Sequence, residues 1–137
     1  MERSLIIYST VDGQTKSICE NISKYASATS VDVLPISSEI NLSDYKQIII
    51  GASIRYGKYR AELYEFIDQN YELLEEKGNA FFSVNVVARK PEKNSPTTNP
   101  YLKKFLENVK WKPKKLAVFA GKIEYPKYKF IDKYAIK

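Results

Sequence analysis

The chain has 137 residues, enough for one domain with a hydrophobic core but too few for two. It is 44% hydrophobic, which favours a folded domain, and it has no histidine, which excludes Ser-His-Asp and Cys-His nucleophile pairs and most zinc sites. The net charge of +6 is uneven: residues 1–85 hold 8 Lys and Arg against 12 Asp and Glu, and residues 86–137 hold 14 against 4. The basic half is either a solvated face or a surface that meets an anionic partner.

The predicted elements alternate between strands and helices along the chain. Apolar runs predict strands at 4–8, 31–34, 46–53, 79–87 and 114–123, and helical spacing predicts helices at 15–26, 60–69 and 101–108. Three prolines between residues 88 and 100 predict a loop. The runs Ile48-Ile49-Ile50 and Ala80-Phe81-Phe82 are continuous rather than alternating, which indicates strands buried on both faces. The order predicts an α/β, doubly wound parallel sheet whose ligand site lies at the carboxyl ends of the strands.

The stretch YSTVDGQTKS joins the first predicted strand to the first predicted helix with hardly a hydrophobic residue. The first N–H groups of a helix have no internal partner and carry partial positive charge, so a phosphate suits this position. Gly13 lets the backbone approach closely, and Ser9, Thr10 and Thr15 offer hydroxyl donors. The alternative is an ordinary helix start capped by Asp12 or Thr10. The P-loop and G-x-G-x-x-G patterns are absent, which argues against those nucleotide sites.

Longer stretches carry a family resemblance. STVDGQT, at 9–15, resembles the phosphate loop of flavodoxins. IIIGASIRYGKY at 48–59, FFSVNVVARKPEKNSPTTNPYLKKFL at 81–106 and AGKIEYPKYKFIDKYAIK at 120–137 resemble the quinone-dependent protoporphyrinogen IX dehydrogenases, a flavodoxin-like family of haem biosynthesis. The resemblance covers essentially the whole chain. It implies one flavodoxin-like domain over residues 1–137 with strand order 2-1-3-4-5, FMN as cofactor, oxidation of protoporphyrinogen IX to protoporphyrin IX, and a membrane quinone as electron acceptor.

The resemblance also implies three cofactor-binding segments. The first segment, residues 9–15, wraps the flavin phosphate. The second, residues 53–57, lies along one side of the flavin ring, with Tyr56 as the stacking candidate. The third, residues 83–89, borders the ring and the ribityl chain from the other side. Ordinary flavodoxins often have an aromatic residue in the third segment, whereas this chain has Asn85 and Val86. The cofactor-binding residues so implied are Ser9, Thr10, Val11, Asp12, Gly13, Gln14, Thr15, Ser53, Ile54, Arg55, Tyr56, Gly57, Ser83, Val84, Asn85, Val86, Val87, Ala88 and Arg89.

The substrate and the catalytic chemistry are expected to involve few protein groups. Flavin chemistry needs positioning and electrostatics rather than a nucleophile, so no acid–base residue and no metal ligand are predicted. Arg55, Arg89, Lys90 and Lys93 lie on the loops that should flank the flavin. They are expected to pair with the propionates of the porphyrinogen, unless they form a solvated rim.

The last stretch, KIEYPKYKFIDKYAIK, mixes lysines with aromatic and aliphatic residues. If it is helical from about Lys129, it suits peripheral binding to a membrane, here the cytoplasmic side of the inner membrane, or it docks as a surface helix. The family continues past this point with the end of the fifth strand and a final helix. The chain is therefore expected to be incomplete at its C-terminus, lacking both, and to be marginally stable or homo-oligomeric.

Two other functions stay open from the sequence. A flavodoxin-like electron carrier is the first alternative, although carriers are usually acidic, and an inactive fragment of the dehydrogenase is the second. Nucleic-acid binding by the basic half has no motif behind it and is not expected.

Overall fold

The computed structural model describes residues 3–9, 14–25, 30–37, 40–54, 58–84 and 99–119. Within the first helix, the side chains of residues 14, 16, 21, 24 and 25 lie outside the description. Several predictions fall outside it as well. These are the loop at 88–98, the end of the fifth strand and the helix expected from residue 129.

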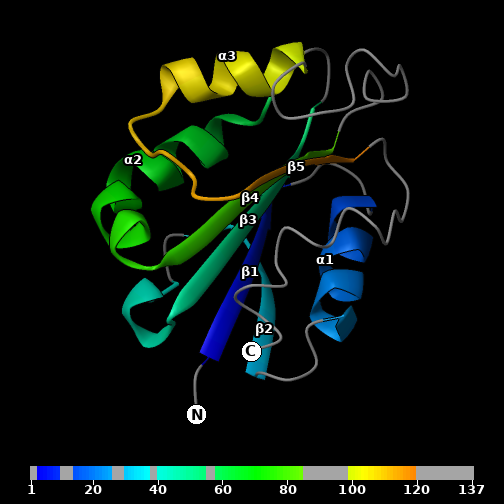
Figure 1. Cartoon of the computed structure of the whole chain (residues 1–137), viewed down its shortest axis with the longest axis vertical. Helices are drawn as coiled ribbons and strands as arrows, with labels where there is room; N and C mark the ends of the chain where they lie inside the picture. The colour runs from blue at the N-terminus through cyan, green and yellow to red at the C-terminus, as the bar shows by residue number, and fades with distance from the viewer. Residues whose placement is uncertain are drawn as a thin grey trace.

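Five parallel strands form one sheet in the order β2-β1-β3-β4-β5, which confirms the predicted fold class and strand order (Figure 1). Each strand turns its amino end toward one edge of the sheet and its carboxyl end toward the other. The strands are β1 (Arg3–Ser9), β2 (Ser30–Pro35), β3 (Gln47–Ser53), β4 (Gly78–Val84) and β5 (Leu116–Phe119).

Helices cover both faces of the sheet (Figure 1). Helix α1 (Gln14–Tyr25) packs on one face through Ile18 and Ile22, and α2 (Ala61–Glu76) and α3 (Pro100–Asn108) pack on the other through Leu63 and Phe105. The two resulting cores explain why the central strands read as continuous apolar runs, because both faces of each strand are buried.

One close packing contact explains a glycine in the middle of β3. Gly51 pairs with Phe82 of β4, and a Cβ atom at position 51 would lie 2.0 Å from Cζ of the Phe82 ring. The ring therefore occupies the space that any side chain at Gly51 would need. Phe82 in turn meets Phe119 of β5 edge-on at 5.5 Å between ring centroids, so three strands share this packing unit.

The structure extends some predicted elements and adds one. Helix α2 was predicted to end at Gln69 but continues to Glu76, because Leu74 carries the buried stripe onward, seven residues after Ile67. A short 3-10 helix, η1 (Leu42–Asp44), capped by Asn41, precedes β3 and was not predicted. Helix α3 begins with Pro100 at its first turn, where a missing N–H costs nothing.

Candidate functional site

The carboxyl ends of the three central strands bring predicted site residues together. Ser9 ends β1, Ser53 ends β3 and Ser83 lies next to the end of β4, and all three are buried. Ser9 and Ser83 flank Ala52 in one row of the sheet, because Ala52 pairs with both. Three predicted segments far apart in sequence therefore start from neighbouring points, as expected for a switch-point site.

Helix α1 begins beside this edge and presents an unsatisfied polar atom. Thr15, its second residue, is 0% exposed, and its Oγ1 has no hydrogen-bond partner in the part of the chain that the structure describes. Buried hydroxyls are normally hydrogen-bonded, and leaving one unpaired costs about 1–3 kcal/mol. A ligand oxygen at the positive end of α1 would satisfy this hydroxyl and the first N–H groups of the helix together. The residues at this position therefore fit a phosphate group.

The hydroxyl of Ser9 has a partner that the sequence did not indicate. Its Oγ donates a hydrogen bond to Oε1 of Glu62 in the first turn of α2, over 3.1 Å. The same Glu62 oxygen lies 3.2 Å from Nε of Arg60, so the carboxylate is paired and hydrogen-bonded. This pairing reduces the negative charge beside a place predicted to hold an anion. Acidic residues are common in the first turn of a helix, so Glu62 carried no distinguishing signal in the sequence.

Ser83 is held from the other side by Tyr59. The Tyr59 hydroxyl donates to Ser83 Oγ over 2.6 Å in a buried contact. Burial raises the pKa of Tyr59 well above its ordinary value, and the bond to Ser83 opposes this only in part, so the phenol stays protonated as a donor. Tyr59 was not predicted as a site residue, because one tyrosine among eleven has no sequence pattern that distinguishes it.

The remaining predicted residues divide between described and undescribed positions. Ile54 is half-buried, and its N–H donates to the carbonyl of Val84 over 3.0 Å, which ties the ends of β3 and β4 together. Gln14 is described as the first residue of α1 but not in its side chain. The others lie outside the described residues: Thr10, Val11, Asp12, Gly13, Arg55, Tyr56, Gly57, Asn85, Val86, Val87, Ala88, Arg89, Lys90 and Lys93.

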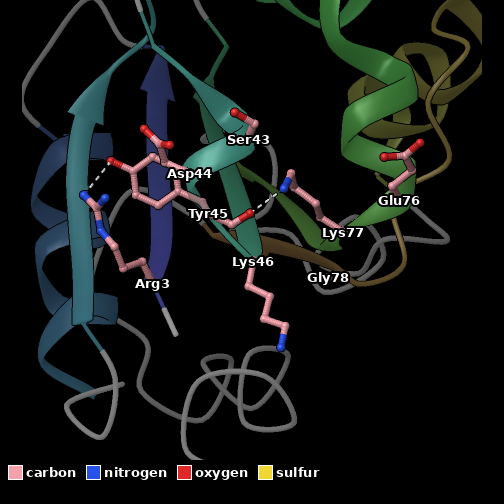
Figure 2. Close-up of a pocket in the computed structure, with 8 residues that line it drawn as sticks. All are labelled: Arg3, Ser43, Asp44, Tyr45, Lys46, Glu76, Lys77 and Gly78. Carbon is pink, nitrogen blue, oxygen red and sulfur yellow. Dashed lines mark hydrogen bonds between the residues drawn. The ribbon is translucent and has the colours of Figure 1, made fainter. Parts of the chain in front are cut away.

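A hollow lies at the opposite, amino edge of the sheet, and Figure 2 shows the residues that line it. It encloses about 760 Å³ and includes Arg3, Tyr45, Lys46 and Lys77. Two of its basic side chains have partners within the chain. Lys77 Nζ donates to the carbonyl of Tyr45 over 2.6 Å, and Arg3 lies over the Tyr45 ring at 4.8 Å from its centroid. These contacts join β1, the segment before β3 and the residue after α2 around the hollow.

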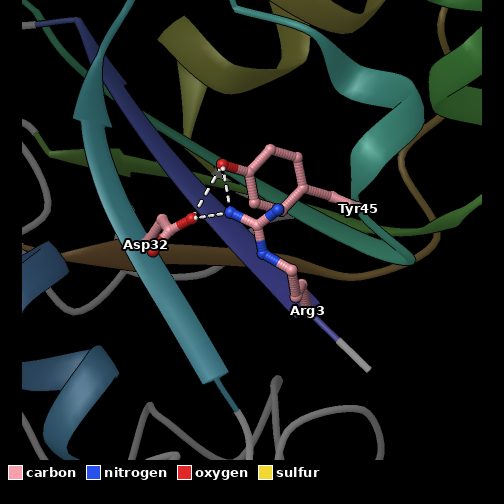
Figure 3. A network of polar contacts seen from close by, with 3 residues as sticks. All are labelled: Arg3, Asp32 and Tyr45. Carbon is pink, nitrogen blue, oxygen red and sulfur yellow. Dashed lines mark hydrogen bonds and ion pairs between the residues drawn. The ribbon is translucent and has the colours of Figure 1, made fainter. Parts of the chain in front are cut away.

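Arg3 also belongs to a polar triad that clamps the amino edge (Figure 3). Its Nη2 lies 2.7 Å from Oδ2 of Asp32, and the Tyr45 hydroxyl donates to the same oxygen over 2.8 Å. The hydrogen bond from Tyr45 and then that from Arg3 lower the pKa of Asp32 below its ordinary value. The triad links β1, β2 and the segment before β3.

Other chemistries find little support among the described residues. Burial raises the pKa of the Cys19 thiol, so it is not a nucleophile at neutral pH. No group of three or more metal-ligating Cys, Asp or Glu side chains gathers in the described ranges. Within those ranges, no helix is both long enough and apolar enough to cross a lipid bilayer.

Comparisons with known proteins agree with this arrangement. A family model described as Flavodoxin domain matches residues 5–137. Protoporphyrinogen IX dehydrogenase [quinone] of Escherichia coli strain K12 is 41% identical over 139 residues, covering 98% of this chain and 77% of the relative.

Solved structures show the same fold at low identity. A short-chain flavodoxin associated with a PDU bacterial microcompartment is 13% identical, with a TM-score of 0.65 over 98% of this chain and 95% of that one. A Fusobacterium nucleatum flavodoxin mutant bound to flavin mononucleotide is 18% identical, with a TM-score of 0.50 over 82% and 67%.

Proposed function

This chain belongs to the flavodoxin domain family and to the family of its protoporphyrinogen IX dehydrogenase relative, and from that premise we propose that it is an FMN-dependent oxidoreductase. Its proposed substrate is protoporphyrinogen IX, its product protoporphyrin IX, and its electron acceptor a quinone. Identity of 41% over nearly the whole chain supports this assignment. We propose that residues 1–137 act as a single flavodoxin-like domain.

The observation that carries the cofactor assignment is the buried hydroxyl of Thr15, which has no hydrogen-bond partner among the described residues. In the proposed complex, Thr15 donates a hydrogen bond to the FMN phosphate at the start of α1, and the helix dipole stabilises the negative charge. Residues 9–14 complete this phosphate loop. Arg60 pairs with Glu62. We therefore propose that the phosphate is bound by hydroxyl and backbone N–H donors and not by the guanidinium group of Arg60.

Two further segments are proposed to hold the flavin ring. They are Ser53–Gly57, with Tyr56 stacked on one face, and Ser83–Arg89 on the other side. The buried starting points of both segments, Ser53 and Ser83, support this proposal, because they fix where each loop leaves the sheet. Arg55, Arg89, Lys90 and Lys93 are proposed to pair with substrate carboxylates.

The bound FMN would supply the hydride acceptor and pass the electrons on to the quinone. The protein's own contribution is positional. The Tyr59–Ser83 hydrogen bond and the buried ends of β3 and β4 hold the edge of the sheet rigid and dry below the proposed ring site. Since the Cys19 thiol is buried and protonated, no covalent step through it is proposed.

We also propose that the protein works at a membrane surface, on the cytoplasmic side of the inner membrane, where a quinone is accessible. The balance of 14 basic against 4 acidic residues in 86–137 supports attraction to anionic lipids. Self-association is a further proposal. Light scattering after size-exclusion chromatography tests it, and vesicle sedimentation with anionic and neutral lipids tests the membrane proposal.

Anaerobic addition of protoporphyrinogen IX to the FMN-loaded protein tests the enzymatic proposal. Bleaching of the flavin absorbance without any other protein, followed by recovery on addition of a quinone, is the expected result. Bleaching that requires a separate reductase would instead indicate an electron carrier. If the protein binds FMN but porphyrinogen never bleaches it, the dehydrogenase proposal fails.

A further inference from the structure

Another hollow lies at the carboxyl edge of the sheet. It encloses about 220 Å³ between the start of α2 and the start of α3. Its walls are Lys58 and Tyr64 on one side and Tyr101 and Lys104 on the other, and Phe105 contributes to its floor. We call it the α2–α3 groove.

The floor of the α2–α3 groove is a rigid aromatic cluster. The Phe105 ring stacks on Phe81 at 4.4 Å between centroids and 12° between planes. Tyr59 meets Phe105 edge-on at 5.2 Å, and Tyr64 lies against the same ring at 5.8 Å. The Tyr59 hydroxyl is fixed by Ser83. Such a floor keeps its shape in the absence of a ligand and offers ring faces and edges to a flat apolar molecule.

The rim carries positive charge that the chain leaves available. Lys58 and Lys104 are exposed, and neither amino group has an ion pair or hydrogen bond in the described part of the chain. The neighbouring basic residue Arg60 is already paired, because its Nε lies 3.2 Å from Oε1 of Glu62. Two unoccupied ammonium groups above an aromatic floor suit a ligand that combines a ring with carboxylates.

A neighbouring hollow between the same helices provides a contrast. It lies toward the end of α3, encloses about 350 Å³, and is lined by Glu65, Asp68 and Lys110. Its two carboxylates would repel an anionic ligand, and Lys110 already lies 5.4 Å above the Tyr71 ring centroid. Among the residues that the structure describes, no acidic side chain lines the α2–α3 groove. Charge therefore favours an anion in the smaller hollow and not in the larger one.

The α2–α3 groove also adjoins the proposed flavin site. Ile54, which lines it, donates its N–H to Val84 at the end of β4, and Tyr59 reaches Ser83 in the same strand. Ile54 directly follows β3, and Ser83 and Val84 end β4. Strands β3 and β4 lead directly into the two segments that are proposed to hold the flavin ring. A molecule seated in the groove would therefore extend toward that ring.

We infer that the α2–α3 groove binds the carboxylate-bearing edge of the porphyrinogen. Lys58 and Lys104 pair with its propionates together with the basic residues of the loops that flank the flavin, and Tyr64 and Tyr101 lie beside its rings. This inference rests on the proposed function and names a substrate subsite within it. A volume of about 220 Å³ is below the roughly 300 Å³ typical of pockets that enclose a whole ligand, so the groove takes only one edge. The rest of the macrocycle remains outside, toward the flavin.

The test compares two double variants of the FMN-loaded protein, titrated with protoporphyrin IX and with its dimethyl ester and followed by porphyrin fluorescence. Lys58→Gln with Lys104→Gln removes both rim charges. Lys103→Gln with Lys112→Gln is the matched control, because it removes the same charge from two exposed lysines that do not line the groove. The rim variant should weaken protoporphyrin IX binding at least tenfold and leave ester binding within about twofold. The control variant should change neither by more than about twofold, and FMN affinity should be the same in all three proteins.

The outcomes separate this inference from the proposed function. Equal loss of porphyrin affinity in both double variants would mean general electrostatic attraction and would overturn the subsite. Unchanged affinity in the rim variant would overturn it too, even if the unmodified protein is bleached by protoporphyrinogen IX. Failure of that bleaching in the unmodified protein would refute the dehydrogenase proposal by itself, whatever the lysine variants show.

Discussion

The two edges of the sheet differ in the hydrogen bonding of particular polar side chains. At the amino edge, Asp32 accepts from both Arg3 and Tyr45. Asn79 donates to the carbonyls of Leu74 and Lys77 and accepts from the N–H of Lys114, which makes three hydrogen bonds. At the carboxyl edge, Thr15 is buried with no described partner. The hollow of about 760 Å³ lies at the amino edge, whereas the proposed phosphate site lies at the carboxyl edge. The proposal therefore follows the buried hydroxyl of Thr15 and not the volume of a hollow.

One buried group near the amino edge departs from this contrast. The indole N–H of Trp111 also lacks a partner in the described ranges, although its ring packs edge-on against Phe81 at 6.2 Å. Trp111 belongs to the hydrophobic core cluster under α2 and α3, whereas Thr15 lies at the start of α1, where the first helix N–H groups also need acceptors. The position at a helix start, and not the missing partner alone, distinguishes Thr15 as a candidate ligand contact.

The largest expected effect is a loss of stability at the amino edge. Asn79→Ala removes three hydrogen bonds at roughly 0.5–1.5 kcal/mol each, so we expect about 2–4 kcal/mol lower free energy of unfolding by urea denaturation. FMN affinity of the folded protein should not change. Asn108→Ala, which removes one exposed bond to a helix carbonyl, is the control and should cost less than about 1 kcal/mol. Equal costs would contradict the proposed importance of the buried junction.

The next effect reverses this pattern at the carboxyl edge. Thr15→Val keeps the side-chain shape but removes the unpartnered hydroxyl, so FMN should bind at least tenfold more weakly, about 1.4 kcal/mol. Stability without FMN should stay the same or rise by ~1 kcal/mol, since an unsatisfied buried oxygen is lost. Isothermal titration calorimetry and thermal melts measure the two quantities.

Thr15→Ser is the matched control for the hydroxyl. It should bind FMN within about threefold of the unmodified protein, well short of the tenfold loss in the valine variant. A valine variant that binds FMN normally would remove the phosphate assignment for this helix.

A smaller effect concerns a carboxyl-edge group that already has a partner. Tyr59→Phe loses the hydrogen bond to Ser83, which should cost about 1 kcal/mol of unfolding free energy. FMN affinity should fall far less than in Thr15→Val, because Tyr59 supports the edge from below. Tyr64→Phe is the control, since its hydroxyl makes no hydrogen bond within the described residues, and it should be neutral. A larger loss of FMN affinity in Tyr59→Phe than in Thr15→Val would contradict the proposal that Thr15 contacts FMN directly and that Tyr59 acts only indirectly.

The smallest effect is the pH dependence of the Asp32 clamp. Its folded-state pKa lies below its unfolded value of about 3.9, so its contribution is fully present above that pH and disappears as the pH falls through the folded-state pKa. The side chains of Arg3 and Asp32 are 46% and 38% exposed, which keeps this contribution small. The Tm difference between the unmodified protein and Asp32→Asn should be constant from neutral pH to about pH 4. Below about pH 4 this difference should decrease towards zero.

Salt provides the control for the Asp32 measurement. Because the pair is partly exposed, raising the ionic strength to about 1 M should shrink the difference at neutral pH. A Tm difference between the unmodified protein and Asp32→Asn that grows on acidification would contradict the lowered pKa of Asp32.

The sequence alone determined the fold class, and it predicted the edge of the sheet at which the site is proposed. Continuous apolar runs such as Ile48–Ile50 and the helical spacing around Ile18 and Ile22 record burial along the chain, and they predicted the parallel sheet that the structure shows. The phosphate-type stretch also marked Thr15 correctly as a residue at the start of α1.

Only the tertiary structure decided which side chains meet. Ser9 reaches Glu62 across 53 positions, Tyr59 reaches Ser83 across 24, and Lys58 lines one groove with Lys104. A sequence pattern reports the environment of each residue along its own segment. The pairing of polar groups depends instead on how α2 and α3 pack beside the strand ends, and that is fixed by the joint burial of segments distant in the chain.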